Sequence, residues 1–176
     1  ARFLTVGPGL KSGIKLRLDN PAQLGAELLC GAVAALAEGP GPLAVISADT
    51  AISIMAVNAK QELVGGVILP GPQLSLAALV QNTAQLPQID LSAPAASSIL
   101  GKNTSACLQN GFVLGTAGLL DGLAAHFQSE LGPDIRFYAT GNLPRTIREA
   151  CRTPIQYREY LITDGLYRIW QKNRKW

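Results

Sequence analysis

The order of apolar and polar positions predicts a helix early in the chain, followed by a block of strands. Apolar residues recur at helical spacing through residues 24–35, directly after Asn20-Pro21, a capping side chain followed by proline. The predicted helix therefore starts near Pro21, runs to about Ala37 and ends in the Gly/Pro-rich residues 38–42.

Three apolar runs then follow at strand length, over residues 43–46, 51–57 and 63–69. A short polar break at 58–61 separates the second run from the third and is typical of a hairpin. Three consecutive strands next to helices predict an α/β fold with a mixed sheet that has an antiparallel three-strand part.

The remaining pattern predicts further helices and strands joined by loops. Residues 85–100 are expected to form a surface loop, and no internal repeat or long linker divides residues 1–176, so we expect a single α/β domain. The other elements are predicted as helices at 73–84, 104–131 and 143–150, strands at 135–140 and 155–157, and a final helix from Thr163.

Charge and composition narrow the class of protein. The net charge is +3, with 48% hydrophobic and 15% charged residues, which excludes a disordered tail. Basic residues gather in the last third of the chain, but no groove-reading motif or interleaved aromatic residues accompany them. A solvated helix face is therefore favoured over a nucleic-acid surface.

The cysteine spacing and the length of the apolar stretches predict in which cellular compartment the protein is found. Cys30, Cys107 and Cys151 are widely spaced and cannot complete a familiar zinc site with His126. An unpaired set fits a reducing environment, and Cys30 and Cys107 are expected to be buried among small apolar residues. The longest apolar stretch, 24–37, is too short to span a bilayer, so a cytoplasmic location without membrane partners is predicted.

Several segments carry a resemblance to a known family. In chain order they are GPGLKSGI (7–14), LDNPAQLGAELL (18–29), PLAVISADTAISI (42–54), GGVILPGPQLSLAALVQNTAQLP (65–87), GKNTSACLQNG (101–111), GTAGLLDGL (115–123) and YATGN (138–142). Together they resemble the C-terminal half of type III pantothenate kinases. The family's first phosphate loop, Asp-x-Gly-Asn-Thr, is absent, and the first lobe is absent with it.

The resemblance implies a fold and a reaction. The family has two similar lobes of the ribonuclease-H-like, actin-like ATPase fold, so this chain would be one such lobe. These kinases transfer the γ-phosphoryl group of ATP to pantothenate, the first step of coenzyme A synthesis. They use Mg²⁺ and a monovalent cation, K⁺ or NH₄⁺, and they form homodimers.

The resemblance also assigns a pantothenate-binding stretch to Gly25, Ala26, Glu27 and Leu28. Glu27 stands at the catalytic base, where the family has Asp, and a solvated carboxylate is the alternative reading. Leu28 stands where the family has an Arg for the substrate carboxylate, so Leu28 itself is expected in the core. Lys11, Lys15 or Arg17 would then have to replace that cation.

Other positions match the nucleotide, cation and subunit contacts of the family. Thr50 and Gly141 match ATP contacts. Ser47 stands where the family has the Asp that binds the monovalent cation, and Asp49 stands where the family has a Gly. If residues 47–49 are a strand, Ser47 and Asp49 share a face, and Asp49 would also repel phosphates. Thr104 matches a pantothenate contact that reaches the partner subunit's site. Asn103 or Thr104 is also expected to cap the helix that follows, and Thr104 can serve both roles.

Two hypotheses follow from these matches and departures. In the first, the chain is the second lobe of a type III pantothenate kinase, incomplete alone and working with a first lobe in a longer or separate chain. In the second, it is a non-catalytic relative, a regulatory or accessory protein that keeps the fold and the dimer surface.

Overall fold

A six-stranded mixed sheet lies at the centre of the molecule. The computed structural model describes residues 4–7, 9–94 and 98–174, and its sheet has the strand order β1-β4-β3-β2-β5-β6. The strands are β1 (Lys15–Leu16), β2 (Leu43–Ala48), β3 (Ala51–Val57), β4 (Glu62–Pro70), β5 (Arg136–Gly141) and β6 (Ile155–Tyr157).

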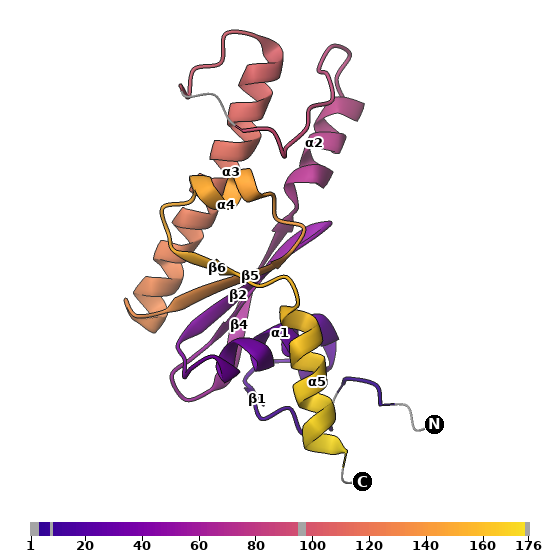
Figure 1. Ribbon diagram of the computed structural model, residues 1–176, viewed down its shortest axis with the longest axis vertical. Coiled ribbons are helices and arrows are strands. Elements are labelled where there is room, and N and C mark those ends of the chain that lie inside the picture. The colour runs from indigo at the N-terminus through magenta and orange to yellow at the C-terminus, as the bar shows by residue number, and fades with distance from the viewer. Residues whose placement is uncertain (1–3, 8, 95–97, 175–176) are drawn as a thin grey trace.

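Helices cover both faces of this sheet (Figure 1). On one face α1 (Ala26–Ala37) and α5 (Leu161–Asn173) share a hydrophobic core with the strands. On the other face α3 (Thr104–Leu131) and α4 (Arg145–Ala150) share a second core. The remaining helices are the short 3₁₀ turn η1 (Pro21–Gln23) and α2 (Pro72–Gln81), which leaves the end of β4.

Strand β2 is buried along its whole length, because its alternate side chains face the two cores. Leu43 and Val45 belong to the core under α1, whereas Ala44 and Ile46 belong to the core under α3. Successive side chains of a strand point to opposite faces, so a strand covered on both sides shows a continuous apolar run.

Most predicted elements are confirmed, including the antiparallel part formed by β2, β3 and β4. The predicted helix start at Pro21 is wrong. The Asn20 side chain accepts from the backbone N–H of Ala22 and closes a single 3₁₀ turn, after which Leu24 has extended backbone angles. Helix α1 then begins at Ala26, with Gly25 as its N-cap.

Strand directions bring several chain connections to one edge of the sheet. β2 runs parallel to β5 and antiparallel to β3, and β4 ends at Pro70, which pairs with Ala51. The β2–β3 turn, the β4–α2 junction and the β5–α4 loop therefore meet at the edge where β2, β4 and β5 end. We call it the carboxyl edge.

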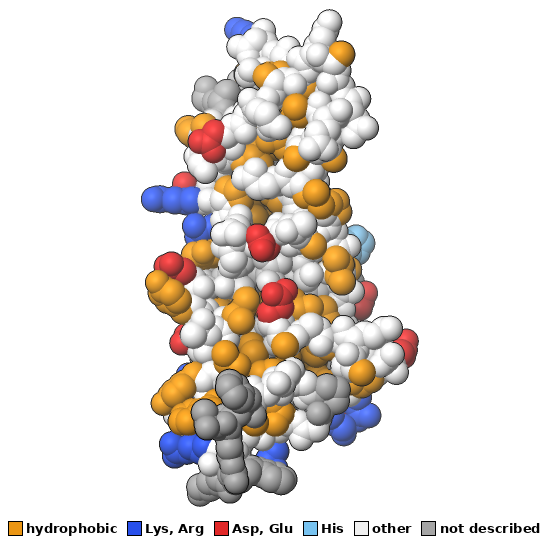
Figure 2. Space-filling view, turned by 90° about the vertical axis from the view of Figure 1, so that its right-hand side faces the viewer, with side chains coloured by type: hydrophobic (Ala, Val, Ile, Leu, Met, Phe, Trp, Pro, Cys, Tyr) orange, Lys and Arg blue, Asp and Glu red, His pale blue; other side chains and the backbone are white. Residues whose placement is uncertain are grey.

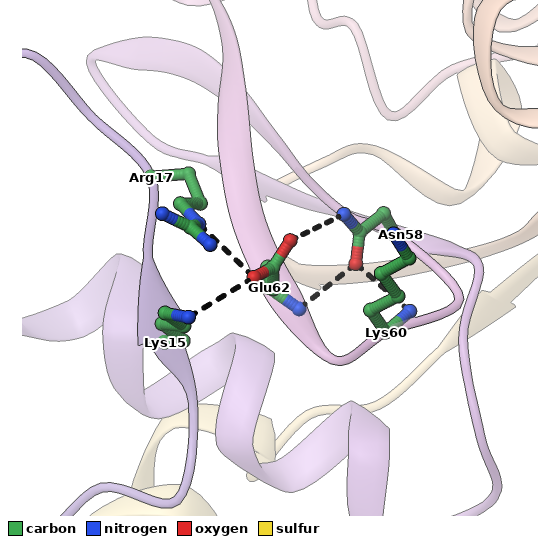
Figure 3. A network of polar contacts seen from close by, with 5 residues as sticks. All are labelled: Lys15, Arg17, Asn58, Lys60 and Glu62. Carbon is green, nitrogen blue, oxygen red and sulfur yellow. Dashed lines mark hydrogen bonds and ion pairs between the residues drawn. The ribbon is translucent and has the colours of Figure 1, made fainter.

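A polar network fastens β1 to β4 at the opposite edge (Figure 3). Arg17 Nε donates to Glu62 Oε1 at 3.0 Å, and Lys15 Nζ lies 3.6 Å from the same oxygen. Asn58 Nδ2 donates to Glu62 Oε2 at 3.1 Å. The hydrogen bonds from Asn58 and Arg17 lower the pKa of Glu62, so this carboxylate stays charged and holds the short β1 strand in register.

Candidate functional site

Three connections pack backbone against backbone at the carboxyl edge. The N–H of Gly71 donates to the carbonyl of Thr50 at 2.9 Å, and the N–H of Asn142 donates to the carbonyl of Ala48 at 2.5 Å. The β2–β3 turn is thus tied on one side to the start of α2 and on the other to the β5–α4 loop.

Two glycines make this close packing possible. A Cβ on Gly71 would lie 2.3 Å from the carbonyl oxygen of Asp49. A Cβ on Gly141 would lie 2.2 Å from the carbonyl oxygen of Ala48, and Gly141 also has a positive φ of 83°. Any side chain at either position would push the connections apart.

A cavity of about 480 Å³ opens between these connections, lined by Asp49, Thr50, Gln73, Leu74 and Asn142. Helix α2 begins beside it with Pro72 in the first turn and no side-chain cap. The first backbone N–H groups of a helix have no partner within the helix and carry partial positive charge. The start of α2 is therefore suited to an anionic group such as phosphate.

Asp49 brings a negative charge to the same cavity. It lies in the β2–β3 turn, after the last residue of β2, and its Oδ1 accepts from Asn142 Nδ2 at 2.9 Å. The carboxylate therefore bridges two of the three connections. Its exposed position leaves the second oxygen open to a hard cation such as Mg²⁺.

Ser47 does not combine with Asp49 as the strand interpretation required. Ser47 belongs to β2, where alternation places it on the α1 face with Val45, and its exposed fraction is 9%. Asp49 lies outside the strand and bonds to Asn142 instead. Within the described part of the chain, no group of three or more His, Cys, Asp or Glu side chains forms a metal site. A monovalent-cation role for Ser47 and Asp49 stays a prediction.

Glu27 lies in the first turn of α1 and is exposed. Gly31 of this helix packs on Val45 of β2, and α1 ends at Ala37 shortly before β2 starts at Leu43, so the two elements run antiparallel. The start of α1, with Gly25, Ala26 and Glu27, therefore points toward the carboxyl edge.

Leu28 is buried, and the basic residues near β1 are exposed and engaged at the start of β4. Leu28 has an exposed fraction of 9% and belongs to the core under α1, as predicted. Lys15 and Arg17 contact Glu62 at the start of β4, whereas the carboxyl edge lies at the end of β4. β4 has nine residues and spans roughly 30 Å, so Lys15 and Arg17 lie far from the cavity, and their replacing the missing cation stays a prediction.

Thr104 is not brought together with Glu27 within one chain. It is the first residue of α3 and is exposed, next to Asn103, whose Oδ1 accepts from the N–H of Ala106 at 2.8 Å. Figure 1 shows this start of α3 at the opposite end of the molecule from α1. Of the two residues predicted to cap this helix, Asn103 is the cap, whereas the predicted capping role of Thr104 is wrong because Thr104 is already the first helical residue.

Sequence reasoning missed Gln73 and Leu74 as cavity residues. The available signal was Pro70-Gly71-Pro72, which indicates a helix start directly after a strand.

The expectation that Cys107 is buried is wrong, because Cys107 is exposed while Cys30 is buried. Cys107 lies in the first turn of α3, and its small apolar neighbours in sequence do not cover it.

Comparisons with known proteins agree on one family. A family model described as type III pantothenate kinase matches residues 1–126. A type III pantothenate kinase from Koribacter versatilis is 37% identical over 171 residues, 97% of this chain and 62% of the relative. One from Exiguobacterium is 35% identical over 174 residues, 99% of this chain and 67% of the relative.

A solved structure supports the fold alone. A Campylobacter jejuni protein assigned to the Baf family of transcriptional activators aligns with a TM-score of 0.55 at 18% identity, covering 84% of this chain and 65% of that one. This chain thus spans roughly two thirds of the length of its relatives.

Proposed function

Because this chain belongs to the type III pantothenate kinase family, we propose that it is the second lobe of a kinase that phosphorylates pantothenate with ATP in the cytoplasm. One observation carries the proposal. The β2–β3 turn, the β5–α4 loop and the uncapped start of α2 meet around one cavity, toward which the Glu27 end of α1 also points.

In this proposal the carboxyl edge receives the phosphates of ATP. Thr50, which lines the cavity, and Gly141, which precedes the lining residue Asn142, contact the nucleotide. The N–H groups at the start of α2 neutralise phosphate charge. Mg²⁺ would supply further charge neutralisation, with Asp49 as the available carboxylate ligand.

Glu27 is the proposed general base. Its carboxylate accepts the proton of the pantothenate hydroxyl as that oxygen forms a bond to the γ-phosphorus, and the bond from this phosphorus to the β–γ bridging oxygen breaks. Gly25 and Ala26 leave the start of α1 free of large side chains, so pantothenate can approach Glu27. Thr104 serves the site of a second copy in the proposed homodimer.

A second candidate function is a non-catalytic member of the same family. It is favoured by the Asp49–Asn142 hydrogen bond, which puts a carboxylate beside the phosphate-binding groups. The burial of Leu28 also leaves this stretch of α1 without a cation for the carboxylate of pantothenate.

Calorimetric titration separates these functions. The chain is titrated with Mg²⁺–ATP and with pantothenate, alone and together with a first lobe taken from a relative. The kinase is supported if the unchanged chain gives binding heat with both ligands. The heat of Mg²⁺–ATP binding should then be lost in Gly71→Val and retained in the distant variant Asp134→Asn. No heat with either ligand in the presence of the first lobe supports the non-catalytic relative.

A further inference from the structure

The β5–α4 loop, Gly141 to Leu143, is held by side chains of β6 and α4. The hydroxyl of Tyr157, the last residue of β6, donates to the carbonyl of Gly141 at 2.9 Å. Nε of Arg148, in the last turn of α4, donates to the carbonyl of Leu143 at 3.3 Å. The residues before and after Asn142 therefore both receive a hydrogen bond from a side chain.

The two donor side chains also contact each other. The guanidinium carbon of Arg148 lies 3.9 Å from the centre of the Tyr157 ring, where the face of the ring attracts a cation. Tyr157 in turn packs against the core under α3. The core therefore fixes the ring, and the ring together with the Leu143 carbonyl fixes the guanidinium.

Arg148 differs from an ordinary surface charge of this protein. Figure 2 shows charged side chains scattered over the side of the molecule that it presents, among hydrophobic ones. Arg145, one turn earlier in α4, is exposed and pairs with Glu149. Arg148 is half-buried, and a charge that leaves water loses solvation unless new contacts compensate for it. The Tyr157 ring and the Leu143 carbonyl supply these contacts.

The Gly141–Asn142 peptide is held at both of its ends. A trans peptide is planar, so its C=O and N–H point in opposite directions. The C=O accepts from the hydroxyl of Tyr157, and the N–H donates to the carbonyl of Ala48 at 2.5 Å. Gly141 has a φ of 83°, and glycine takes other backbone angles at little cost. The two hydrogen bonds, rather than the backbone of Gly141, therefore keep this peptide from turning over.

The orientation of this peptide sets one wall of the cavity at the carboxyl edge. Asn142 lines that cavity, and its Nδ2 donates to Asp49 Oδ1 at 2.9 Å. If the peptide turned over, the N–H of Asn142 would leave Ala48 and the side chain would lose its place beside Asp49. The hydroxyl of Tyr157 thus acts on the cavity through the loop, without lining the cavity itself.

We propose that Tyr157 and Arg148 are positioning residues for the nucleotide, which lock the β5–α4 loop in the shape that receives the phosphates of ATP. This inference rests on the proposed function, because that function makes the cavity a phosphate site. Tyr157 holds the carbonyl of Gly141 directly. Arg148 holds the carbonyl of Leu143 and keeps the Tyr157 ring in place.

Calorimetry with Mg²⁺–ATP and with pantothenate, each in the presence of a first lobe from a relative, compares the unchanged chain with Tyr157→Phe and Arg148→Leu. The matched controls are Tyr160→Phe, which removes a hydroxyl from an exposed ring, and Arg145→Leu, which removes a charge from the same helix. Amide hydrogen exchange followed by NMR reports on the N–H of Asn142 in each variant. Thermal unfolding verifies that each variant is folded.

We expect Tyr157→Phe and Arg148→Leu to bind Mg²⁺–ATP roughly fivefold more weakly, the effect of losing about one hydrogen bond, and to bind pantothenate as the unchanged chain does. The N–H of Asn142 should exchange roughly tenfold faster in Tyr157→Phe, because the loop then opens more often. Tyr160→Phe and Arg145→Leu should match the unchanged chain in both measurements.

Unchanged Mg²⁺–ATP affinity in Tyr157→Phe overturns the inference, whether or not the N–H of Asn142 exchanges faster. An equal loss of affinity for both ligands also overturns it, because Tyr157 then supports the fold in general rather than the nucleotide loop. If the unchanged chain binds no Mg²⁺–ATP, the proposed function and this inference fail together. If binding changes as expected but the complex does not phosphorylate pantothenate, the proposed function fails and this inference stands.

Discussion

Asp49 places a carboxylate where the surrounding backbone offers donors to an anion. The start of α2 favours a phosphate, whereas the charge of Asp49 opposes one. The bond from Asn142 holds that charge at the cavity instead of letting it turn toward solvent. Binding of a polyphosphate without a divalent cation should therefore be weak.

Replacing Asp49 with Asn should strengthen binding of metal-free ATP by about tenfold. Two charges about 4 Å apart interact by roughly 1 to 4 kcal/mol between bulk water and a protein surface, and 1.4 kcal/mol corresponds to tenfold. Titration in EDTA measures the effect. Asp134→Asn, an equal change of charge at an exposed residue far along the sequence, is the control. Equal affinities in the two variants would contradict the role given to Asp49.

The cysteines should differ sharply in reactivity. Burial raises the pKa of Cys30, and burial together with the Asp121 carboxylate raises the pKa of Cys151 to about 11, whereas Cys107 is exposed. At pH 8 roughly one Cys151 in a thousand is thiolate, the reactive form. Mass spectrometry after brief alkylation should find modification at Cys107, and Cys107→Ser should remove the fast phase. Equally rapid labelling of Cys151 would contradict the prediction that burial and a raised pKa keep this thiol unreactive.

At the scale of elements, periodicity predicted most of the fold. The apolar runs of β2 to β4 and the cap at Asn103 are local signals, and the structure bears them out. The break between η1 and α1 depends on the extended backbone at Leu24, which no local signal marks. The cavity residues Gln73 and Leu74 depend on which connections meet at one edge, and that is set by strand order rather than by sequence spacing.

Asp121 joins α3 to the segment between α4 and β6. Its carboxylate accepts from the N–H groups of Arg152 and Thr153, each at 2.9 Å. Burial raises the pKa of Asp121, but these hydrogen bonds outweigh burial and hold it below its ordinary value.

Asp121→Ala should therefore lower the free energy of unfolding by about 1 kcal/mol at pH 7. A lowered pKa in the folded state means that this contribution is present above the ordinary carboxyl pKa and is lost as pH falls through the lowered pKa. Urea unfolding from pH 7 to pH 3 should show the difference shrinking. A difference that stays constant over that range would contradict the hydrogen-bonding role of the carboxylate.

Gly165→Ala tests the crossing of α5 and α1. The added Cβ meets the backbone of Cys30, so the helices must separate, and the free energy of unfolding should fall by about 1–3 kcal/mol or more. Gly118→Ala on α3 is the matched control, because a Cβ there meets nothing within 4 Å and alanine favours a helix by up to about 1 kcal/mol. Similar stability changes in both variants would show that α5 does not pack as described.

At the scale of the whole molecule, the proposed function makes the described chain one side of a site. The sheet, both cores and the cavity at the carboxyl edge are present. Among the described residues, none of the helices has the length and apolar character of a membrane span. Residue matches predicted the family, because several ordered segments were preserved together. They did not predict the exposed, stacked pair Tyr167 and Trp170 on α5, since such a pair is recognised only once the structure shows which side of the helix is buried.

The rate of pantothenate phosphorylation by the chain, with and without a first lobe from a relative, tests the central claim most directly. The account predicts no turnover by the chain alone, turnover when the lobe is added, and loss of that turnover in Glu27→Gln but not in the distant control Glu130→Gln. Turnover by the chain alone at the rate of the complex would contradict it, and so would a stable complex that binds ATP and pantothenate yet forms no product.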